Sequence, residues 1–434
     1  LKMEGESVDI MCDLSPGYEK FVCYENGKKV LYLELLKALY GCVQSALLWY
    51  ELFSGTLKQG MGFKLNPYDT CIANKTTDKK QCPIAWYVDD TKISHVDDNV
   101  VSHVIERIED RFGEMSVTRG KEHVFLGMNI NFNKNGTASI KMKDYIKEAI
   151  ADFGESITRS ATTPAKKDLF EIDEESGPLT NKDKETFHSI VAKLLYVSKR
   201  GRLDIQLPIA FLCTRVSCST EKDWSKLKRV LEYLKGTLDE FLTLGADDLG
   251  IMRTWVDASY AVHEDMKSHT GGVVSFGRGA VMSKSSKQRL NTKSSAEAEL
   301  VGASDYLPYP IWAKYFLEAQ GYTLNENIFY QDNQSTIRFE KNGRKSCGPK
   351  SRHIDIRYFF IQNRIDLASI DVQYCPTEQM LADFFTKPLQ GNLFRKFREV
   401  ILGHKHIDSL KRITTITSQE RVEKDSLSAN KWNE

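Results

Sequence analysis

The chain lacks the patterns of several common classes of protein. Its nine cysteines are scattered over 434 residues with no C-x-x-C pair, which argues against a zinc site and suits a reducing compartment. No apolar run approaches the length of a membrane span, so we expect no membrane partner. The formal net charge is +1, so any basic surface must be local. What remains is an ordinary globular composition, with 41% hydrophobic and 27% charged residues, long enough for two or three domains.

Residues 82–95 read CPIAWYVDDTKISH and predict a tight hairpin. An apolar run, residues 84–88, leads into Asp89 and Asp90, and a second β-prone run follows at once. Adjacent carboxylates repel each other unless a hard cation such as Mg²⁺ lies between them. Residues 87–90 taken alone could instead form an ordinary surface turn, in which Asp is common. The motif from Tyr87 to Asp90 resembles the polymerase motif of reverse transcriptases, which implies that Tyr87 contacts nucleic acid and that both aspartates are catalytic metal ligands.

Residues 31–57 carry apolar side chains at helical spacing and predict one long amphipathic helix, with a possible break at Gly41. The stretch ALYGCVQSALLWYE within it resembles a segment of copia-type retrotransposon Pol polyproteins. Most of its apolar residues are expected to pack in the core. Gly41 and Gln44 are expected to face template or nucleotide.

The following segments continue this resemblance through the polymerase palm into the thumb, over residues 1–153. Helices are expected over residues 100–112 and 141–153. Phe125, Leu126 and Gly127 stand where the family holds the primer end, and a buried strand is the alternative for them. The family also needs a further metal-binding aspartate on an upstream strand. We expect the chain to be a piece of a longer polypeptide that binds primer and template, and that uses dNTPs only with the upstream segment present.

Residues 154–182 are rich in Ser, Thr, Pro, Lys and Glu and predict a linker or surface loop. Three amphipathic helices are expected next, over residues 185–200, 204–216 and 221–235. This part, residues 154–248, resembles the copia-type connection between polymerase and nuclease.

Residues 249–402 predict strands and helices in the order βββαβαβα. Acidic residues stand at strand ends or on one helix face, which suggests a layered sheet that carries a carboxylate cluster. The motifs VDASYA, SSAEAEL, QDNQSTIR, SRHIDIRYFFI and PTEQMLADFFTKPL resemble, in order, the RNase H domain of copia-type elements. The chain as a whole is thus expected to be α+β or α/β, with a partial palm and thumb, a helical connection and an RNase H-like mixed sheet with flanking helices.

The resemblance places four catalytic carboxylates at Asp257, Glu299, Asp332 and Asp383. Glu297 is a rival for the second position. Glu299 is preferred because Glu-Leu followed by small or apolar residues matches the family, and because residue 297 lies two positions off that helix face.

Four carboxylates at one point become useful when they hold two Mg²⁺ or Mn²⁺ ions about 3.5–4 Å apart. The reaction implied is hydrolysis of the RNA strand in an RNA–DNA hybrid. Basic runs that include Lys284, Arg289 and Arg344 are candidates to hold phosphate, although mixed-charge surface loops often look the same.

Residues 403–434 predict a polar tail. The family resemblance implies a cytoplasmic virus-like particle, with a nuclear stage as a further possibility. A competing hypothesis is a decayed fragment that binds nucleic acid without catalysis. The lack of the further polymerase aspartate favours this hypothesis for the polymerase part. The presence of all four nuclease carboxylates argues against it for the RNase H-like part.

Overall fold

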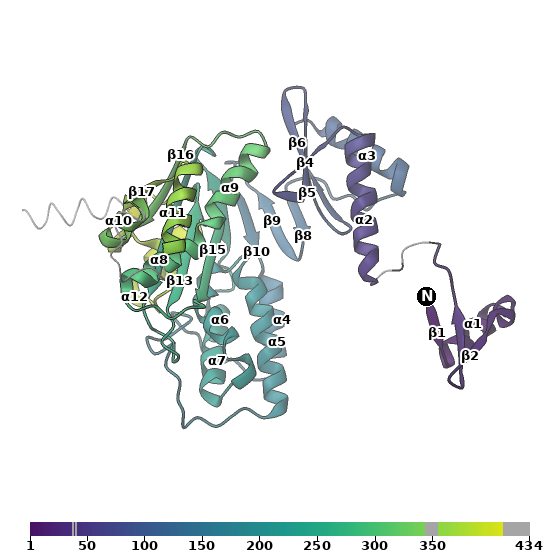
Figure 1. Cartoon of the computed structure of the whole chain (residues 1–434), viewed down its shortest axis with the longest axis horizontal. Coiled ribbons are helices and arrows are strands. Elements are labelled where there is room, and N and C mark those ends of the chain that lie inside the picture. Colours follow the sequence, from purple (N-terminus) through teal and green to yellow (C-terminus); the bar gives the residue numbers. More distant parts are fainter. Residues whose placement is uncertain (37–38, 40, 343–354, 411–434) are drawn as a thin grey trace, which may run out of the picture. The chain divides into compact units, whose positions relative to one another are not determined.

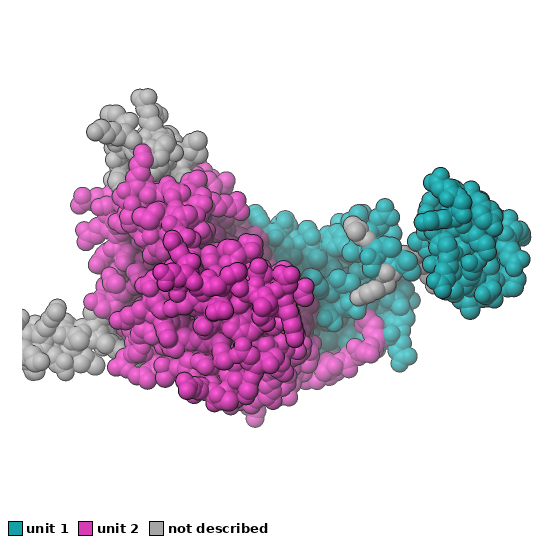
Figure 2. Space-filling model, turned by 90° about the horizontal axis from the view of Figure 1, so that it is seen from below, with its two compact units in different colours: residues 1–114 teal, residues 115–434 magenta. Residues whose placement is uncertain are grey.

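The computed structural model describes residues 1–36, 39, 41–342 and 355–410. The chain divides into two compact units, Leu1–Glu114 and Met115–Glu434, which Figure 2 colours separately. Both units mix helices with sheets, so the predicted α+β or α/β class is confirmed at this level. Within the described ranges, no helix has the length and apolar content that crossing a bilayer requires.

Unit 1 contains two antiparallel sheets (Figure 1). The first has three short strands in the order β1 (Lys2–Glu4), β3 (Lys28–Tyr32), β2 (Cys23–Glu25), with helix α1 (Glu6–Leu14) and a 3₁₀ turn (Pro16–Phe21) between β1 and β2. The second is a four-stranded meander of β4 (Lys64–Asn66), β5 (Asp69–Thr77), β6 (Lys80–Tyr87) and β7 (Asp90–Ile93). The predicted hairpin of residues 84–94 is therefore confirmed as β6 and β7.

Strand β6 buries alternate side chains, which is the period expected of a strand with one covered face. Cys82, Ile84 and Trp86 are buried. The ring of Trp86 lies 5.3 Å, centroid to centroid, from Phe53 on helix α2 (Val43–Gly55). Helix α3 (Asp98–Phe112) matches the predicted helix of residues 100–112. The ring of Phe112, at the end of this helix, lies 5.6 Å, centroid to centroid, from that of Phe53.

The single helix predicted over residues 31–57 is wrong. Leu31 belongs to β3, where it pairs with Met3 and is fully buried. The helix begins only at Val43, after Gly41, whose φ of 89° lies in the left-handed region that ends or precludes an α-helix for most residues. Apolar spacing alone could not separate a strand, a turn and a helix that follow one another directly.

Unit 2 opens with a five-stranded sheet in the order β14-β11-β10-β9-β8. Three strands precede the helical connection and two follow it: β8 (Glu122–Phe125), β9 (Met128–Phe132), β10 (Ala138–Lys141), β11 (Leu242–Ala246) and β14 (Gly277–Arg278). Between β10 and β11 lie α4 (Lys143–Asp152), α5 (Asn181–Ser198), α6 (Gln206–Cys213) and α7 (Glu221–Gly236), so the four helices predicted here are confirmed with shifted ends.

A second five-stranded sheet carries the acidic residues. Its order is β15 (Met282–Lys287), β13 (His269–Ser275), β12 (Ile251–Ser259), β16 (Glu326–Gln331), β17 (Asp371–Tyr374). Strand β13 is antiparallel to its two neighbours, β15 and β12, whereas β12, β16 and β17 run parallel, so the predicted mixed sheet is confirmed. The helices of this part are α8 (Ser295–Tyr306), α9 (Pro308–Ala319), α10 (Gln334–Asn342), α11 (Asp355–Leu367) and α12 (Gly391–Ile401).

The two faces of this sheet belong to different apolar cores. One face places Val256, Val274 and Phe329 against α8 and α11. The other places Trp255 and Val273 in a core shared with the connection helices and α12. The connection and the acidic sheet are consequently packed together within one unit.

Two segments predicted to be loosely attached contribute to that shared core. In residues 154–182, the side chains of Ile157, Ala165 and Leu169 are buried, because they fill gaps between the connection helices. In the predicted polar tail, Ile407 and Leu410 are buried in the same core. Short apolar runs among polar residues gave too weak a periodic signal to reveal this burial. Residues 411–434 lie outside the described part.

A buried ion pair ties the connection together. Arg202 and Asp204 are each almost fully buried, and Arg202 donates two hydrogen bonds to the Asp204 carboxylate, at 2.9 and 2.8 Å. Tyr233 of α7 donates a third hydrogen bond, at 2.5 Å. Burial alone would raise the pKa of Asp204, but the charge of Arg202 outweighs it and holds that pKa below its ordinary value.

Removing one partner of this pair should therefore destabilise the chain strongly. We expect Asp204→Ala to lower the free energy of unfolding of unit 2 by about 3–5 kcal/mol, because Arg202 keeps a buried charge without its partner. The measurement is urea denaturation followed by circular dichroism. The matched control is Asp239→Ala, whose carboxylate pairs with Lys143 at 2.6 Å on the surface and should matter little. Equal midpoints for Asp204→Ala and the parent would contradict this account of the pair.

Candidate functional site

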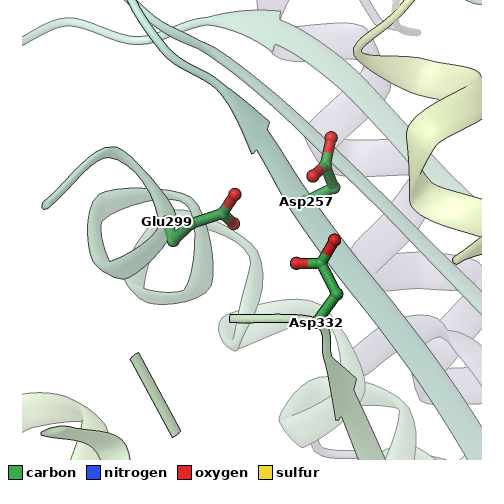
Figure 3. A group of neighbouring side chains, drawn as sticks. All are labelled: Asp257, Glu299 and Asp332. Carbon is green, nitrogen blue, oxygen red and sulfur yellow. The ribbon is translucent and has the colours of Figure 1, made fainter. Parts of the chain in front are cut away.

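Three acidic side chains of unit 2 converge at one point (Figure 3). Asp257 lies near the end of β12, Asp332 directly follows β16, and Glu299 comes from α8. One carboxylate oxygen from each lies within 4.8 Å of the others. Trp255 and Tyr330 are paired across the parallel strands, so Asp257 and Asp332, two residues further on, reach the same edge on the same face.

The cluster is shielded from water. Asp257 and Glu299 are buried, at 1% and 6% exposure, and Asp332 is half-buried. Burial raises the pKa of Glu299 well above its ordinary value, and the nearby charges of Asp257 and Asp332 add to the effect. The pKa of Asp332 is raised for the same two reasons, burial first and then Asp257. In this environment a positive charge among the three groups would be strongly favoured.

The donor set fits a hard divalent cation. All the converging atoms are carboxylate oxygens, the ligands that Mg²⁺ and Mn²⁺ prefer. Within the described part of the chain, Oε2 of Glu299 is buried and has no hydrogen-bond partner. A buried oxygen left unpaired is costly, and coordination of a cation would satisfy it.

The structure also separates the two glutamates that compete for this position. Glu299 belongs to the cluster. The carboxylate of Glu297 accepts a hydrogen bond from the backbone amide of Lys293 at 2.7 Å, and its own amide donates to Ser294 at the start of α8. Glu297 thus takes part in capping the helix.

Asp383, the fourth predicted carboxylate, is buried beside the cluster but is not one of the three converging groups. Burial, followed by the charge of Asp257, raises its pKa to about 7. Asp383 lies in the second of two 3₁₀ turns, Thr377–Gln379 and Leu381–Phe385, which Met380, with a ψ of 87°, separates. The expectation that four carboxylates meet at one point is therefore met by three.

Lys387 connects Asp383 to the cluster and was not recognised from the sequence. Its Nζ lies 2.7 Å from Oδ1 of Asp383 and 3.4 Å from Oδ1 of Asp257. Burial opposes the charge of Lys387, but the two aspartates outweigh burial and raise its pKa above the ordinary value. The hydroxyl of Thr386 donates to the other oxygen of Asp257. The spacing of Lys387 four residues after Asp383 was the available signal.

Gly271 allows this segment to approach the sheet. A Cβ at Gly271 would come within 2.6 Å of the Thr386 side chain and 2.8 Å of the Ala382 carbonyl oxygen. Strand β13 can therefore accept the 3₁₀ turn at Leu381–Phe385 only because this residue has no side chain.

The second predicted acidic site is the β6–β7 hairpin of unit 1. Tyr87 pairs with Asp90, so Val88 and Asp89 form a two-residue loop. Val88 has a φ of 55°, a strained conformation for a β-branched residue. Both aspartates and Tyr87 are exposed. Across the described ranges, the Asp257 cluster is the one group of three or more acidic, His or Cys side chains close enough to share an ion.

Trp49 of α2 holds the hairpin loop. Nε1 of Trp49 donates to the carbonyl oxygen of Val88 at 2.5 Å. The same ring stacks on Phe53 at 5.5 Å and meets Phe112 edge-on at 5.2 Å. The match of Trp49 to the copia-type segment was the signal available for this contact.

The remaining predicted residues occupy varied positions. Gly41 forms a turn, and Gln44 is exposed on the first turn of α2. Phe125 ends β8, and Leu126 and Gly127 form the two-residue turn to β9, so the alternative of a buried strand is wrong for the turn itself.

Of the three basic residues predicted to hold phosphate, two are described. Nζ of Lys284 donates to the backbone carbonyl of Asp305 at 3.3 Å and lies over the ring of Tyr309. Arg289 is exposed in the loop before α8. Arg344 lies outside the described residues.

Repulsion between the crowded carboxylates should lower the stability of the chain when no cation is bound. Glu299→Gln keeps the side chain's shape and removes its charge, so we expect it to stabilise the chain in EDTA by about 1–3 kcal/mol. Thermal melting of the parent and variant in EDTA measures this. Glu297→Gln is the matched control and should show no such gain, since its carboxylate caps α8. A lower melting temperature for Glu299→Gln would show that Glu299 is not crowded by its neighbours.

Comparison with known proteins gives the context of both acidic sites. Residues 15–167 match a family model described as reverse transcriptase (RNA-dependent DNA polymerase). The chain is 28% identical over 388 residues to the retrovirus-related Pol polyprotein from transposon TNT 1-94 of Nicotiana tabacum, covering 88% of this chain and 29% of that protein. It is 28% identical over 375 residues to the corresponding polyprotein from transposon RE1 of Arabidopsis thaliana, covering 85% and 25%.

A shorter relative matches over most of its own length. The putative transposon Ty5-1 protein of Saccharomyces cerevisiae is 29% identical over 278 residues, covering 63% of this chain and 87% of that protein. A solved foamy virus protease-reverse transcriptase aligns with 83% of this chain and 41% of its own, at 15% identity and a TM-score of 0.21, too low to support any argument. The chain spans less than a third of the tobacco and Arabidopsis polyproteins. The reverse transcriptase match over residues 15–167 and these Pol relatives support the resemblance of the chain to copia-type retrotransposon Pol polyproteins.

Proposed function

We propose that the Asp257 cluster hydrolyses the RNA strand of RNA–DNA hybrids with the help of two divalent cations, Mg²⁺ or Mn²⁺. The observation that carries the proposal is the convergence of Asp257, Glu299 and Asp332 within 4.8 Å in a buried setting. The mixed sheet and the motifs along it agree with the predicted RNase H-like domain.

The family context supports the choice of substrate. An RNA-dependent DNA polymerase copies RNA into DNA, so its product is an RNA–DNA hybrid, and the family model for such an enzyme matches this chain. A nuclease on the same chain would find hybrids at high local concentration. Recognition of the RNA strand would depend on its 2′-hydroxyl groups, which only RNA presents.

The residues of the cluster have separable tasks. Bound divalent cations would activate the attacking water and stabilise the leaving oxygen of an in-line phosphoryl displacement. Asp257 contributes the central carboxylate, fixed by Thr386 on one oxygen and by Lys387 near the other. Glu299 and Asp332 supply the facing oxygens, and the burial of Asp257 and Glu299 strengthens the electrostatic interactions at the site.

The test is cleavage of a hybrid that carries a 5′-labelled RNA strand, with single-stranded RNA and double-stranded DNA as substrate controls. We expect cleavage that requires Mg²⁺ or Mn²⁺ and falls at least about a hundredfold in Asp257→Asn and in Asp332→Asn, since cation binding is worth several kcal/mol. Asp265→Asn is the matched control, because that aspartate pairs with Lys267 and Lys287 away from the cluster. Cleavage that survives both cluster substitutions, or its absence in the parent, rejects the proposal in favour of a non-catalytic nucleic-acid-binding fragment.

We further propose that Asp89 and Asp90 belong to an RNA-directed DNA polymerase site, which would bind primer, template and dNTP. The family match over residues 15–167 and the exposed aspartates at the β6–β7 turn favour it. Within the described residues the two carboxylates have no third acidic neighbour close enough to share an ion. A further carboxylate, supplied from outside these residues, would complete the site.

We therefore expect the 434-residue chain to extend no primer on an RNA template, measured by incorporation of labelled dNTPs in Mg²⁺. Asp89→Asn and Asp90→Asn should leave hybrid cleavage at the parental rate, because those residues belong to the other unit. Primer extension by the parent that disappears in Asp90→Asn would show instead that the two aspartates already form a complete site.

A further inference from the structure

Lys387 occupies an unusual position for a cation in a cluster of metal-binding character. Its ammonium group contacts both Asp257 and Asp383, at 3.4 and 2.7 Å. The converging group consists of Asp257, Glu299 and Asp332 and does not include Asp383. Asp257 therefore belongs to two groups: the three crowded carboxylates, and a second group with Asp383 and Lys387.

The backbone around Lys387 is fixed by several hydrogen bonds. The hydroxyl of Ser259 donates to the Thr386 carbonyl at 3.1 Å, and that of Ser285 donates to the Phe385 carbonyl at 2.8 Å. The Lys387 amide donates to the Asp383 carbonyl at 2.9 Å. The backbone that carries Lys387 is thus fixed by the fold and is not part of a freely moving surface loop.

The side chain nonetheless has a route out of the cluster. It is 40% exposed, whereas the side chains of Asp257 and Asp383 are at most 5% exposed. The four-carbon stem of lysine has many rotamers, so its ammonium group can exchange carboxylate contacts for water while the backbone stays in place. A cation arriving between Asp257 and Asp383 could take the place of the ammonium charge without rearrangement of the sheet.

We propose that Lys387 is a positioning residue that holds Asp257 and Asp383 together and is displaced by the second of the two cations. This inference rests on the proposed two-cation function. The first cation is bound among Asp257, Glu299 and Asp332, where Lys387 contacts only Asp257, at the longer of its two distances. The second binds between Asp257 and Asp383 only by displacing the ammonium group, so Lys387 makes its affinity weaker and orders the binding of the two ions.

The test measures ion binding, which does not depend on turnover. Mn²⁺ is titrated into the chain by isothermal calorimetry, and bound Mn²⁺ is counted by electron paramagnetic resonance. In the parent we expect one tighter and one weaker ion. In Lys387→Met, which keeps the length of the side chain and removes its charge, the weaker ion should bind about tenfold more tightly. The tighter ion should gain less, because the removed like charge lies nearest to the Asp257–Asp383 position.

Two variants separate this role from simple packing. Lys387→Arg keeps the charge and should retain a weak second ion. Lys267→Met removes the lysine paired with Asp265 elsewhere in unit 2 and should leave both affinities at parental values. In EDTA, Lys387→Met should also melt at a lower temperature than the parent, since Asp257 and Asp383 lose their counter-ion.

The outcomes distinguish this inference from the proposed reaction. An unchanged second affinity in Lys387→Met, or an equal change in affinity at both positions, overturns the role given to Lys387. Failure of the parent to bind Mn²⁺ overturns both proposals. If the parent binds two ions but cleaves no hybrid, the reaction is rejected, while tighter second binding in Lys387→Met still supports the displacement.

Discussion

Electrostatic repulsion between carboxylates is the constraint that shapes unit 2. Separate elements are needed to hold Asp257, Glu299 and Asp332 together against it. Parallel pairing of β12 with β16 aligns the two aspartates, and α8, packed through its apolar face on the sheet, brings the glutamate. The 3₁₀ turn at Leu381–Phe385 adds Asp383, and Lys387 follows it with the neighbouring positive charge. Apolar burial on both faces of the sheet supplies the free energy that offsets this local cost.

The two acidic sites show how strongly environment changes the behaviour of the same chemical group. Asp89 and Asp90 are exposed at a turn, where water screens their repulsion and the fold needs no cation to tolerate them. Asp257 and Glu299 are buried, where each charge is felt by the other with little screening. The strain in the hairpin lies in the backbone at Val88, held by Trp49, whereas the strain in the cluster is electrostatic.

The sequence predicted the parts of the fold whose periodicity is strong. The alternation in β6 and the acids at the ends of β12 and β16 were sufficient to predict the strands that carry these acids. The single helix over residues 31–57 failed because apolar spacing cannot distinguish a helix from a strand and turn next to it. The role of Lys387 also escaped prediction, because its contact with Asp257 joins residues 130 positions apart in the chain. The requirement for glycine at position 271 was missed for the same reason, because it arises only from the distant segment that packs against this residue.

That long sequence separation also determines when the cluster can form during folding. The hydrogen bond from Ser259 to the Thr386 carbonyl spans 127 residues, and closing so large a loop is entropically slow compared with forming α8 or the β12–β13 pair. Newly made chains would thus hold three acidic side chains near one another before the last segment docks. Until then the aspartate of β12 lacks both its hydroxyl donor and its ammonium neighbour. The carboxylates therefore repel one another most strongly before the final segment, with Lys387, settles onto the strand beside Gly271.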